Sequence, residues 1–304
     1  MAVDVNSNKY TFMFAAVMVV VVATVLALAA ESLKPMQKAN VANEKRQNIL
    51  QSVGIKAEAL EAEAMYEKYK QEELILDAYG KRKENVIRAP FDVNMLKDYK
   101  GGLSNIYKLY KSGNGSVSLE DTRASLAAWG EDGVGADFPL YVIKDDEGQT
   151  SYIVPMMGTG LWGPVWGYLA IAEDGSTVTG AIFDHKSETP GLGAEIKEAG
   201  FQVPFQGKQI FMESGELKGV VAKKGGAEPD DPHGVDAISG GTITSNGVNE
   251  MIYRTLKIYE PYFLELRNGA SKTEMVEVVE MVADSLMTVS VDSLVVDSTK
   301  IVKS

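Results

Sequence analysis

The hydrophobic pattern of the chain begins with one long apolar run near the N-terminus. Residues Tyr10 to Ala30 include no charged side chain, and a helix of this length, at about 1.5 Å per residue, spans roughly 30 Å, the thickness of the hydrocarbon core of a bilayer. A cleaved signal peptide is the alternative, since Ala27-Leu28-Ala29 fits a small-residue cleavage site. The run is longer than the roughly 7–15 apolar residues of a signal peptide. We therefore expect a retained transmembrane helix over residues 10–30, after a tail of residues 1–9.

The charges beside this run do not define its orientation. Lys9 precedes the run with Asp4 nearby, while Lys34 and Lys38 follow it. Because cytoplasmic flanks carry the excess of lysine and arginine, this distribution leans slightly against an exported body. The side on which the body lies has to come from other evidence.

Polar, helix-forming residues follow the apolar run. The stretch from Glu31 to about Gly80 is rich in alanine, glutamate, lysine and glutamine, which predicts helix with a break at Val53-Gly54-Ile55. The sequence is then mixed, with glycine-rich loops, as far as Gln149. We expect residues 31–149 to form a helical and mixed membrane-proximal region.

Short strand patterns begin at Thr150. Apolar runs or alternations predict strands at Ser151–Val154, Tyr168–Ala172 and Thr177–Phe183, with a hairpin turn at Glu173–Ser176. The later elements expected are a helix around Leu192–Gly200, strands near Gln209–Phe211 and Gly219–Ala222, and a closing helix over Asn246–Leu266. The closing helix has an apolar stripe of Val248, Met251, Ile252, Leu256 and Tyr259. This order predicts an α+β domain over residues 150–269, with a mostly antiparallel sheet packed by helices.

The pattern changes again after Gly269. Glu274–Met287 reads as helix, and Thr288–Ser304 alternates valine with serine and aspartate, as a strand or a loose tail would. We treat residues 270–304 as a C-terminal extension to which the pattern assigns no role.

Composition limits the chemistry open to the chain. The formal net charge is −12, and a surface of this sign repels nucleic-acid phosphates, so we expect no nucleic-acid partner. The absence of cysteine excludes disulfides, thiolate nucleophiles and thiolate metal sites. With only two histidines, a metal centre would need nearly every imidazole of the chain, so we expect none. Redox chemistry would have to come from an organic cofactor.

Two glycine motifs precede the closing helix. Gly158-Thr-Gly160-Leu-Trp-Gly163 has the letters of a dinucleotide fingerprint, but Pro164 and a strand-like run follow where that fingerprint needs a helix. We interpret it as a tight turn that exposes Leu161 and Trp162. The second motif, Glu188-Thr-Pro-Gly-Leu-Gly193, predicts a turn that opens a helix. Such a loop is common without function, and beside an aromatic turn it also suits the wall of a ring-shaped ligand.

The segment from Gly234 to Val248 combines glycines, hydroxyl side chains and the start of a helix. Gly240 and Gly241 allow the backbone to approach an anion, and the helix that follows directs its positive dipole end there. A plain N-capped helix after a glycine turn is the more frequent explanation, and on residue chemistry alone both remain open. Lys224 upstream would add positive charge, or belongs to a solvated loop. A serine hydrolase triad of Ser239, His233 and Asp236 lacks the G-x-S-x-G elbow, so we reject it.

Taken together, these motifs resemble the family of C subunits of Na⁺-translocating NADH:quinone oxidoreductases, within the wider family of FMN-binding domains. The matching blocks are Gly160-Leu-Trp162, Glu188-Thr-Pro-Gly-Leu-Gly193, Lys224-Gly-Gly-Ala227, His233-Gly-Val-Asp236 and Ser239-Gly-Gly-Thr-Ile-Thr-Ser-Asn-Gly-Val248. The family reads S-G-A-T where this chain has Ser239-Gly240-Gly241-Thr242, so Gly241 replaces the usual alanine. The match is close over residues 150–268 and weak over residues 57–149.

The resemblance implies a flavin site centred on Thr242, where the family joins FMN covalently through a phosphoester. It implies that Leu161, Trp162 and Leu192 pack on the flavin ring, with Thr189 and the backbone of Gly191–Gly193 at its polar edge. Glu188 is a further residue that we expect to bind the cofactor. Lys224 and Thr244 would neutralise or hydrogen-bond the phosphate, and Ser239, Gly240 and Gly241 would form the loop at the attachment point.

The resemblance also implies the setting of the chain. It would carry electrons as one subunit of a Na⁺-pumping complex in the cell inner membrane, in contact with other subunits and the lipid bilayer. A flavin transferase would install the FMN. The tail of residues 1–9 would be cytoplasmic and the flavin domain would lie on the periplasmic side.

Two other interpretations remain open at this point. One is the related G subunit of an Rnf-type ferredoxin:NAD⁺ reductase, which has a similar span and threonine. The other is a membrane-anchored, non-redox module that holds phosphate or flavin without a covalent bond.

Overall fold

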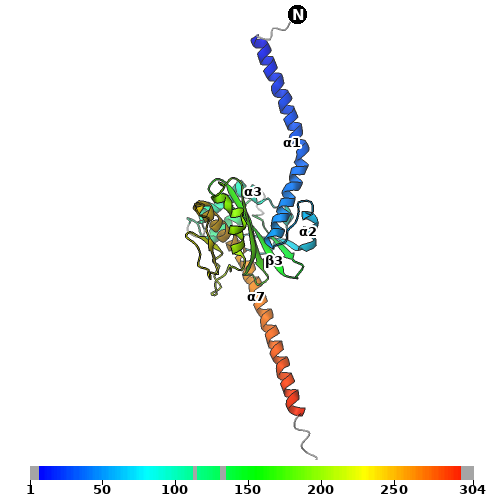
Figure 1. The fold of residues 1–304 in the computed structure, drawn as a ribbon, viewed down its shortest axis with the longest axis vertical. Coiled ribbons are helices and arrows are strands. Elements are labelled where there is room, and N and C mark those ends of the chain that lie inside the picture. Colours follow the sequence, from blue (N-terminus) through cyan, green and yellow to red (C-terminus); the bar gives the residue numbers. More distant parts are fainter. Residues whose placement is uncertain (1–6, 112–114, 131–134, 296–304) are drawn as a thin grey trace, which may run out of the picture.

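The computed structural model describes residues 7–111, 115–130 and 135–295, with side chains as far as residue 269. One body lies between two long helices that leave it in opposite directions (Figure 1). The helices are α1 (Asn8–Ser52) and α7 (Thr242–Val295). The described chain is therefore an α+β body with a long apolar helix at its N-terminal end.

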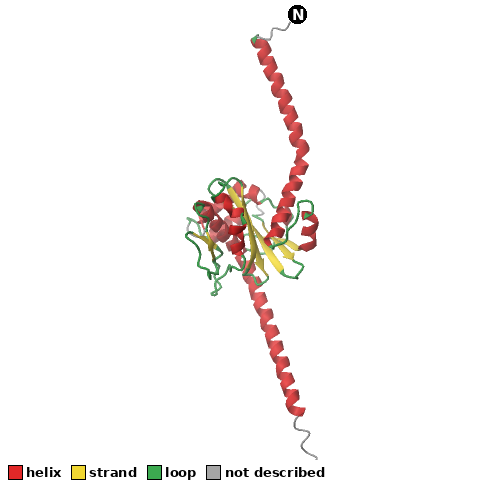
Figure 2. Ribbon diagram, viewed as in Figure 1, coloured by secondary structure: helices red, strands yellow, loops and turns green. Residues whose placement is uncertain are grey.

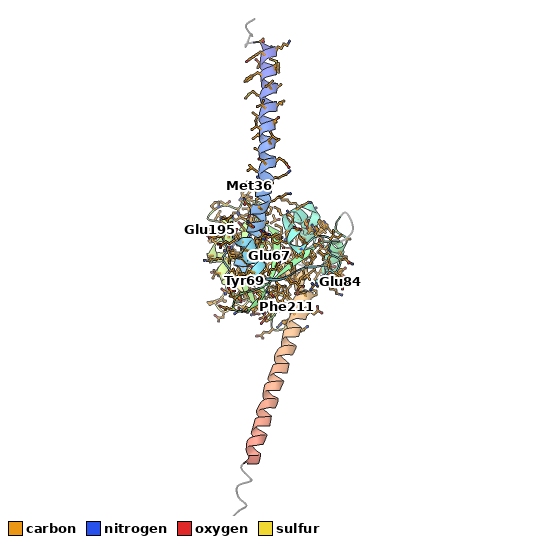
Figure 3. The ribbon with its side chains drawn as sticks, turned by 90° about the vertical axis from the view of Figure 1, so that its right-hand side faces the viewer. Met36, Glu67, Tyr69, Glu84, Glu195 and Phe211 are labelled. Atoms are coloured by element: carbon orange, nitrogen blue, oxygen red, sulfur yellow. The ribbon has the colours of Figure 1, made fainter. Side chains whose placement is uncertain are left out.

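Helix α1 is exposed over its first part and buried at its end. Its most apolar window has a mean hydropathy of 2.8 and no buried residue, so by length and composition it can cross a membrane. Side chains project from it on all sides above the body, down to Met36 (Figure 3). Ile49 and Leu50 are fully buried, and the helix ends against β5, where a Cβ on Gly180 would meet the Ser52 carbonyl. The end of α1 is thus fixed to the body.

The predicted helix beyond residue 53 is only partly confirmed. A break follows Ser52, with Gly54 at a φ of 80°, and α2 (Ala62–Tyr69) is helical. The continuation to Gly80 is wrong, because Lys70–Leu76 forms strand β1. The polar start of this strand has the composition of a helix, but its buried end, Leu74 to Leu76, pairs with β2. Long-range pairing has overridden local propensity here.

The core of the body is a five-stranded antiparallel sheet in the order β1-β2-β3-β4-β5 (Figure 2). Its remaining strands are β2 (Phe138–Lys144), β3 (Thr150–Thr159), β4 (Pro164–Ala172) and β5 (Val178–His185). The three strands predicted after residue 150 are confirmed as parts of β3, β4 and β5. Because β1 and β2 precede residue 150, the sheet begins before the segment that we assigned to the flavin domain.

Helix α7 packs across this sheet. The predicted apolar stripe is confirmed, since Val248, Met251, Ile252, Leu256 and Tyr259 are all fully buried. The helix approaches β3 closely where glycines remove the side chain: a Cβ on Gly158 would lie 2.9 Å from the Met251 Cβ, and one on Gly247 would meet the Thr159 carbonyl. This close contact fixes the start of α7 against the end of β3.

Smaller elements complete the body. They are η1 (Pro90–Asp92), α3 (Met95–Asp98), η2 (Tyr99–Leu103), α4 (Ser104–Tyr110), α5 (Leu119–Ala127), η4 (Gly193–Lys197), α6 (Ala199–Gln202) and η5 (Val203–Phe205). The helix expected at Leu192–Gly200 is thus two short turns. A separate parallel pair joins β6 (Val221–Lys223) to β7 (Gly234–Asp236). The strand expected at Gln209–Phe211 is wrong, because these residues form only isolated bridges.

The C-terminal extension continues α7 away from the body (Figure 1). The helix predicted at Glu274–Met287 is confirmed, and helix also replaces the strand or tail expected from Thr288 as far as Val295. Residues 296–304 lie outside the described residues.

Candidate functional site

Three segments that are distant in sequence meet around one hollow of about 250 Å³. They are the β3–β4 turn, the loop after β5 and the first turn of α7. The hollow is lined by Leu161, Glu188, Thr189, Leu192, Gly193, Gly240, Gly241, Thr242, Ile243 and Thr244. We call it the Thr242 hollow. All of these residues except Ile243 belong to the site predicted from the sequence.

The β3–β4 turn presents two large apolar side chains to the surface. The amide of Gly160 donates a 2.8 Å hydrogen bond to the Gly163 carbonyl, which closes the turn. Leu161 is 49% exposed and Trp162 is 66% exposed. Strand β4 follows directly, so the rejection of a dinucleotide fingerprint is confirmed.

The buried carboxylate of Glu188 connects the three segments. Its Oε1 accepts a 2.8 Å hydrogen bond from the Trp162 amide, and its Oε2 accepts hydrogen bonds from the Leu161 amide at 3.3 Å and the Thr244 hydroxyl at 2.6 Å. Glycines make room for it, since a Cβ on Gly193 would lie 2.5 Å from Oε2. Both oxygens of the Glu188 carboxylate therefore accept hydrogen bonds from within the protein.

Hydrogen bonding keeps this carboxylate ionised. Burial raises the pKa of the Glu188 carboxyl, but the hydrogen bonds from the Thr244 hydroxyl and from the amides of the β3–β4 turn outweigh burial, so the pKa lies below the usual value for glutamate. The backbone amide of Glu188 in turn donates to His185 Nδ1 at 3.1 Å. At neutral pH a charged group thus positions the turn, the loop and the helix start.

The two threonines of the helix start have different surroundings. Thr244 is buried, and its hydroxyl proton is donated to Glu188, so this hydroxyl has no proton left to donate to a phosphate. Thr242 is half-buried at the first position of α7. Thr242 lines the hollow, and its hydroxyl makes no hydrogen bond to any residue that the structure describes. Of the two, Thr242 has the available hydroxyl.

The backbone around Thr242 suits an anion. The first helical hydrogen bond of α7 runs from the Ser245 amide to the Gly241 carbonyl at 2.9 Å, which leaves the earlier amides without intrahelical partners at the positive end of the helix dipole. Gly240 has a φ of +73°, and a Cβ there would lie 2.6 Å from a methyl carbon of Leu192. A residue with a side chain at position 240 would be strained and would clash with Leu192, so glycine lets the loop pass close to the hollow without filling it.

Four predicted residues do not line the Thr242 hollow. Trp162 and Ser239 are exposed beside it, and Gly191 is exposed in the loop, where its amide donates to Glu195 at 2.9 Å. Lys224 is exposed in the turn after β6. Among the described residues that line the hollow there is no lysine or arginine.

Sequence reasoning missed Ile243. It is 57% exposed and lines the hollow between the two threonines. A large apolar residue at an exposed first turn, flanked by two candidate hydroxyls, was a signal that could have identified it.

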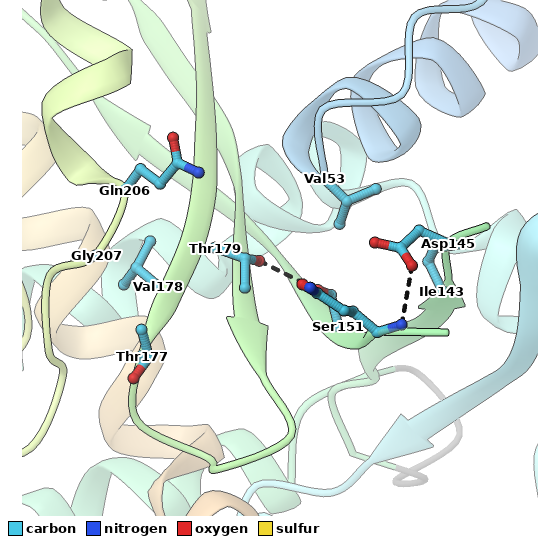
Figure 4. Close-up of a pocket in the computed structure, with 10 residues that line it drawn as sticks. Val53, Ile143, Asp145, Ser151, Thr177, Val178, Thr179, Gln206 and Gly207 are labelled. Atoms are coloured by element: carbon cyan, nitrogen blue, oxygen red, sulfur yellow. Dashed lines mark hydrogen bonds between the residues drawn. The ribbon is translucent and has the colours of Figure 1, made fainter. Parts of the chain in front are cut away.

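Two alternative sites receive no support from the described residues. His233 Nδ1 contacts the Gln209 carbonyl at 2.6 Å and Asp236 accepts a hydrogen bond from the Ala227 amide, so neither forms a triad with Ser239. Within the described ranges no three histidine or acidic side chains group as a metal site. A hollow of about 280 Å³ beside the end of α1, where Ser151 and Thr179 are 3.2 Å apart, contains none of the predicted residues (Figure 4).

Known proteins match the chain over this site. A family model described as FMN-binding domain matches residues 160–257, which include every residue that lines the Thr242 hollow. The C subunit of the Na⁺-translocating NADH-quinone reductase of Haemophilus ducreyi is 33% identical over 229 residues, covering 74% of this chain and 80% of that protein.

Solved structures match as well. The C subunit of the Na⁺-translocating NADH-quinone reductase from Parabacteroides distasonis is 35% identical with a TM-score of 0.59, covering 76% of this chain and 96% of that one. NqrC from Shewanella oneidensis, at 24% identity and a TM-score of 0.55, has the same fold over 75% of this chain and 98% of its own.

Proposed function

The chain belongs to the family of Na⁺-translocating NADH-quinone reductase C subunits, and on that premise we propose that it is the membrane-anchored, FMN-carrying subunit of such a complex. The relatives named above are C subunits, which favours this family over the G subunit of an Rnf-type complex. A bound FMN supplies electron transfer at its ring, and the protein supplies attachment, placement and surroundings. The other subunits of the complex are the partners with which it exchanges electrons.

The FMN phosphate is attached to the Thr242 hydroxyl through a phosphoester. The observation that carries this assignment is the contrast between the two threonines: Thr242 presents to the hollow a hydroxyl with no partner among the described residues, while the hydroxyl of Thr244 is buried and donates to Glu188. With no cation among the lining residues, the amides at the start of α7 would hold the phosphate oxygens. A flavin transferase installs the group, and Lys224, which does not line the hollow, does not hold the phosphate.

The flavin ring lies against the apolar side chains around the mouth of the hollow. A volume of about 250 Å³ is small beside the roughly 300–1,000 Å³ of typical ligand pockets, so it accommodates the phosphate end better than a whole FMN. Leu161, Leu192 and Ile243 are each 42–57% exposed at this mouth. An apolar ring stacked on them would cover surface that is otherwise in contact with water.

Helix α1 anchors the body in the cell inner membrane, with the body on the periplasmic side and residues 1–9 in the cytoplasm. Family resemblance supports this orientation, because the charges beside the span do not define it. Since α7 leaves the body on the side away from α1, its first turn lies toward the side from which α1 arrives (Figure 1). That placement would direct the flavin toward the membrane part of the complex.

Covalent attachment is tested on a denaturing gel viewed under ultraviolet light. The full chain is expressed with a flavin transferase, and Thr242→Val should abolish the fluorescent band while Thr244→Ser, which keeps the hydroxyl donor to Glu188, retains it. Mass spectrometry of the peptide spanning Asp236 to Arg254 should show the mass of FMN less water. A fluorescent band in Thr242→Val, or none in the unaltered chain, would refute the attachment.

A further inference from the structure

A second hollow, of about 360 Å³, lies between α7 and the segment from η2 to the end of α4. It shares no lining residue with the Thr242 hollow. Six of its lining residues matter here: Tyr99, Tyr107, Lys108, Lys111, Glu250 and Arg254. We call it the Arg254 hollow.

Arg254 is a buried cation with an unused donor. It is 4% exposed, and its guanidinium carbon lies 4.4 Å from the ring centre of Tyr107 and 5.5 Å from that of Tyr99. One terminal nitrogen donates to the Met157 carbonyl. Its Nε is buried and has no hydrogen-bond partner among the described residues. Burying an unsatisfied donor is costly, so the protein leaves the donor capacity of this guanidinium incompletely used, and Arg254 lines the hollow.

Two exposed lysines add charge at the same hollow. Lys108 is on α4, and Lys111 follows its end with a φ of 42°. Lys111 is the only described non-glycine residue with positive φ, a conformation that is costly for a side chain with a Cβ. The positive charges of Arg254 and the two lysines and the negative charge of Glu250 give the lining a formal net charge of +2, whereas the whole chain has a net charge of −12.

Two tyrosines line the hollow beside these cations. The hydroxyls of Tyr99 and Thr159 are 2.9 Å apart and hydrogen-bonded, which fixes the orientation of the Tyr99 ring. Burial raises the pKa of Tyr107 to about 12, so its hydroxyl keeps its proton at neutral pH. Hydroxyl donors beside three cations suit an oxyanion.

We propose that the Arg254 hollow binds a phosphate monoester dianion, through the Arg254 guanidinium with Lys108 and Lys111. The net charge selects this ligand class: a carboxylate carries one negative charge, whereas a phosphate monoester carries about −1.5 to −2 at pH 7. The α4 wall lies outside residues 160–257, the part that matches the FMN-binding domain. Glu250 and Arg254 lie within the matched part, but the hollow shares no lining residue with the Thr242 hollow, so it would be an anion site separate from the flavin attachment.

The test uses the full flavin-loaded chain in detergent micelles. Inorganic phosphate is titrated by calorimetry at constant ionic strength against the wild type, the double variant Lys108→Ala/Lys111→Ala and the control Lys56→Ala/Lys144→Ala. The control removes two exposed lysines that do not line this hollow, one of which, Lys144, pairs with Thr150 at the start of β3. Because all four lysines are exposed, none of these changes should unfold the protein.

Wild type and control should bind phosphate with the same affinity. The Lys108/Lys111 variant should bind it at least about tenfold more weakly, because it loses charge-assisted hydrogen bonds to the phosphate. A second experiment tests whether the phosphate monoester is a lipid headgroup. In that case phosphatidic acid in phosphatidylcholine nanodiscs should protect Lys108 and Lys111 from acetylation more than it protects Lys56. Absence of both effects, or phosphate binding that the Lys108/Lys111 variant leaves unchanged, overturns the proposal. All variants should keep the fluorescent flavin band, which separates this result from the flavin assignment.

Discussion

Replacing Glu188 with glutamine tests whether one carboxylate holds the flavin site together. In the folded protein it accepts three hydrogen bonds, at 2.8 Å from the Trp162 amide, 3.3 Å from the Leu161 amide and 2.6 Å from the Thr244 hydroxyl. A glutamine amide can accept on only one of its two atoms, so at least one amide of the turn faces an N–H group instead. The charge assistance at the remaining contacts is also lost.

The magnitude follows from these contacts. Hydrogen bonds to charged groups contribute about 1.5–3 kcal/mol each, and a buried donor left unpaired costs about 1–3 kcal/mol. Part of the loss is recovered because the Thr244 hydroxyl can rotate to accept from the new amide. We expect Glu188→Gln to lower the free energy of unfolding by about 2 kcal/mol, which is roughly 4–8 °C in Tm for a body of this size.

The loss should depend on pH in a defined direction. The folded pKa of Glu188 is depressed below its ordinary value, so its stabilisation is fully present above the unfolded pKa, near 4.3–4.5, and disappears as pH falls through the lower folded pKa. The difference between wild type and Glu188→Gln should therefore be constant above about pH 5 and shrink below about pH 4.

Urea unfolding of the full chain in detergent, followed by tryptophan fluorescence between pH 3.5 and 7.5, measures this difference. Glu198→Gln is the matched control, because Glu198 is exposed at the start of α6 and its loss should change stability by less than about 0.5 kcal/mol. Equal stability of Glu188→Gln and wild type at pH 7, or a difference that persists undiminished at the lowest pH, would refute the role given to this carboxylate.

Two further changes test the same site. Gly193→Ala places a Cβ 2.5 Å from Glu188 Oε2 and should lower Tm by several degrees in a thermal unfolding scan, whereas Gly200→Ala, with nothing within 4 Å of its Cβ, should not; equal Tm values would show that Gly193 is not sterically required. Trp162→Ala removes a side chain that is 66% exposed, so Tm should stay within about 2 °C. If Trp162 packs on the ring, as the family resemblance implies, the flavin should remain on Thr242 with a shifted absorption spectrum, and an unchanged spectrum would show that the ring does not contact Trp162.

Part of the candidate site followed from local sequence. The Gly160–Gly163 segment could be read as an aromatic turn because Pro164 and apolar alternation excluded a following helix, and the structure has that turn. Gly240 and Gly241 before a helical stripe indicated a helix start close to an anion site. The local pattern could not show which of the two threonines, Thr242 or Thr244, has a hydroxyl that is free of hydrogen bonds within the protein. That depends on Glu188, which lies 56 residues from Thr244 in sequence.

The sequence by itself determined the features that depend on neighbouring residues. An uncharged stretch of bilayer length predicted an exposed apolar helix, short apolar runs or alternations predicted parts of β3, β4 and β5, and the stripe from Val248 to Tyr259 predicted a buried helix face. Each of these features depends on the order of apolar and polar side chains along a single element, and that order can be read directly from neighbouring residues.

Only the tertiary structure decided the features that depend on contacts between distant segments. Lys70–Leu76 became a strand because β2 offered it backbone partners, and the Arg254 hollow formed because α4 lies against α7. Glu188 became a buried acceptor because the turn and the helix start both meet its loop. Hydrogen-bond partners, burial and the resulting pKa shift are properties of the assembled neighbours, so no local pattern in the chain contains them.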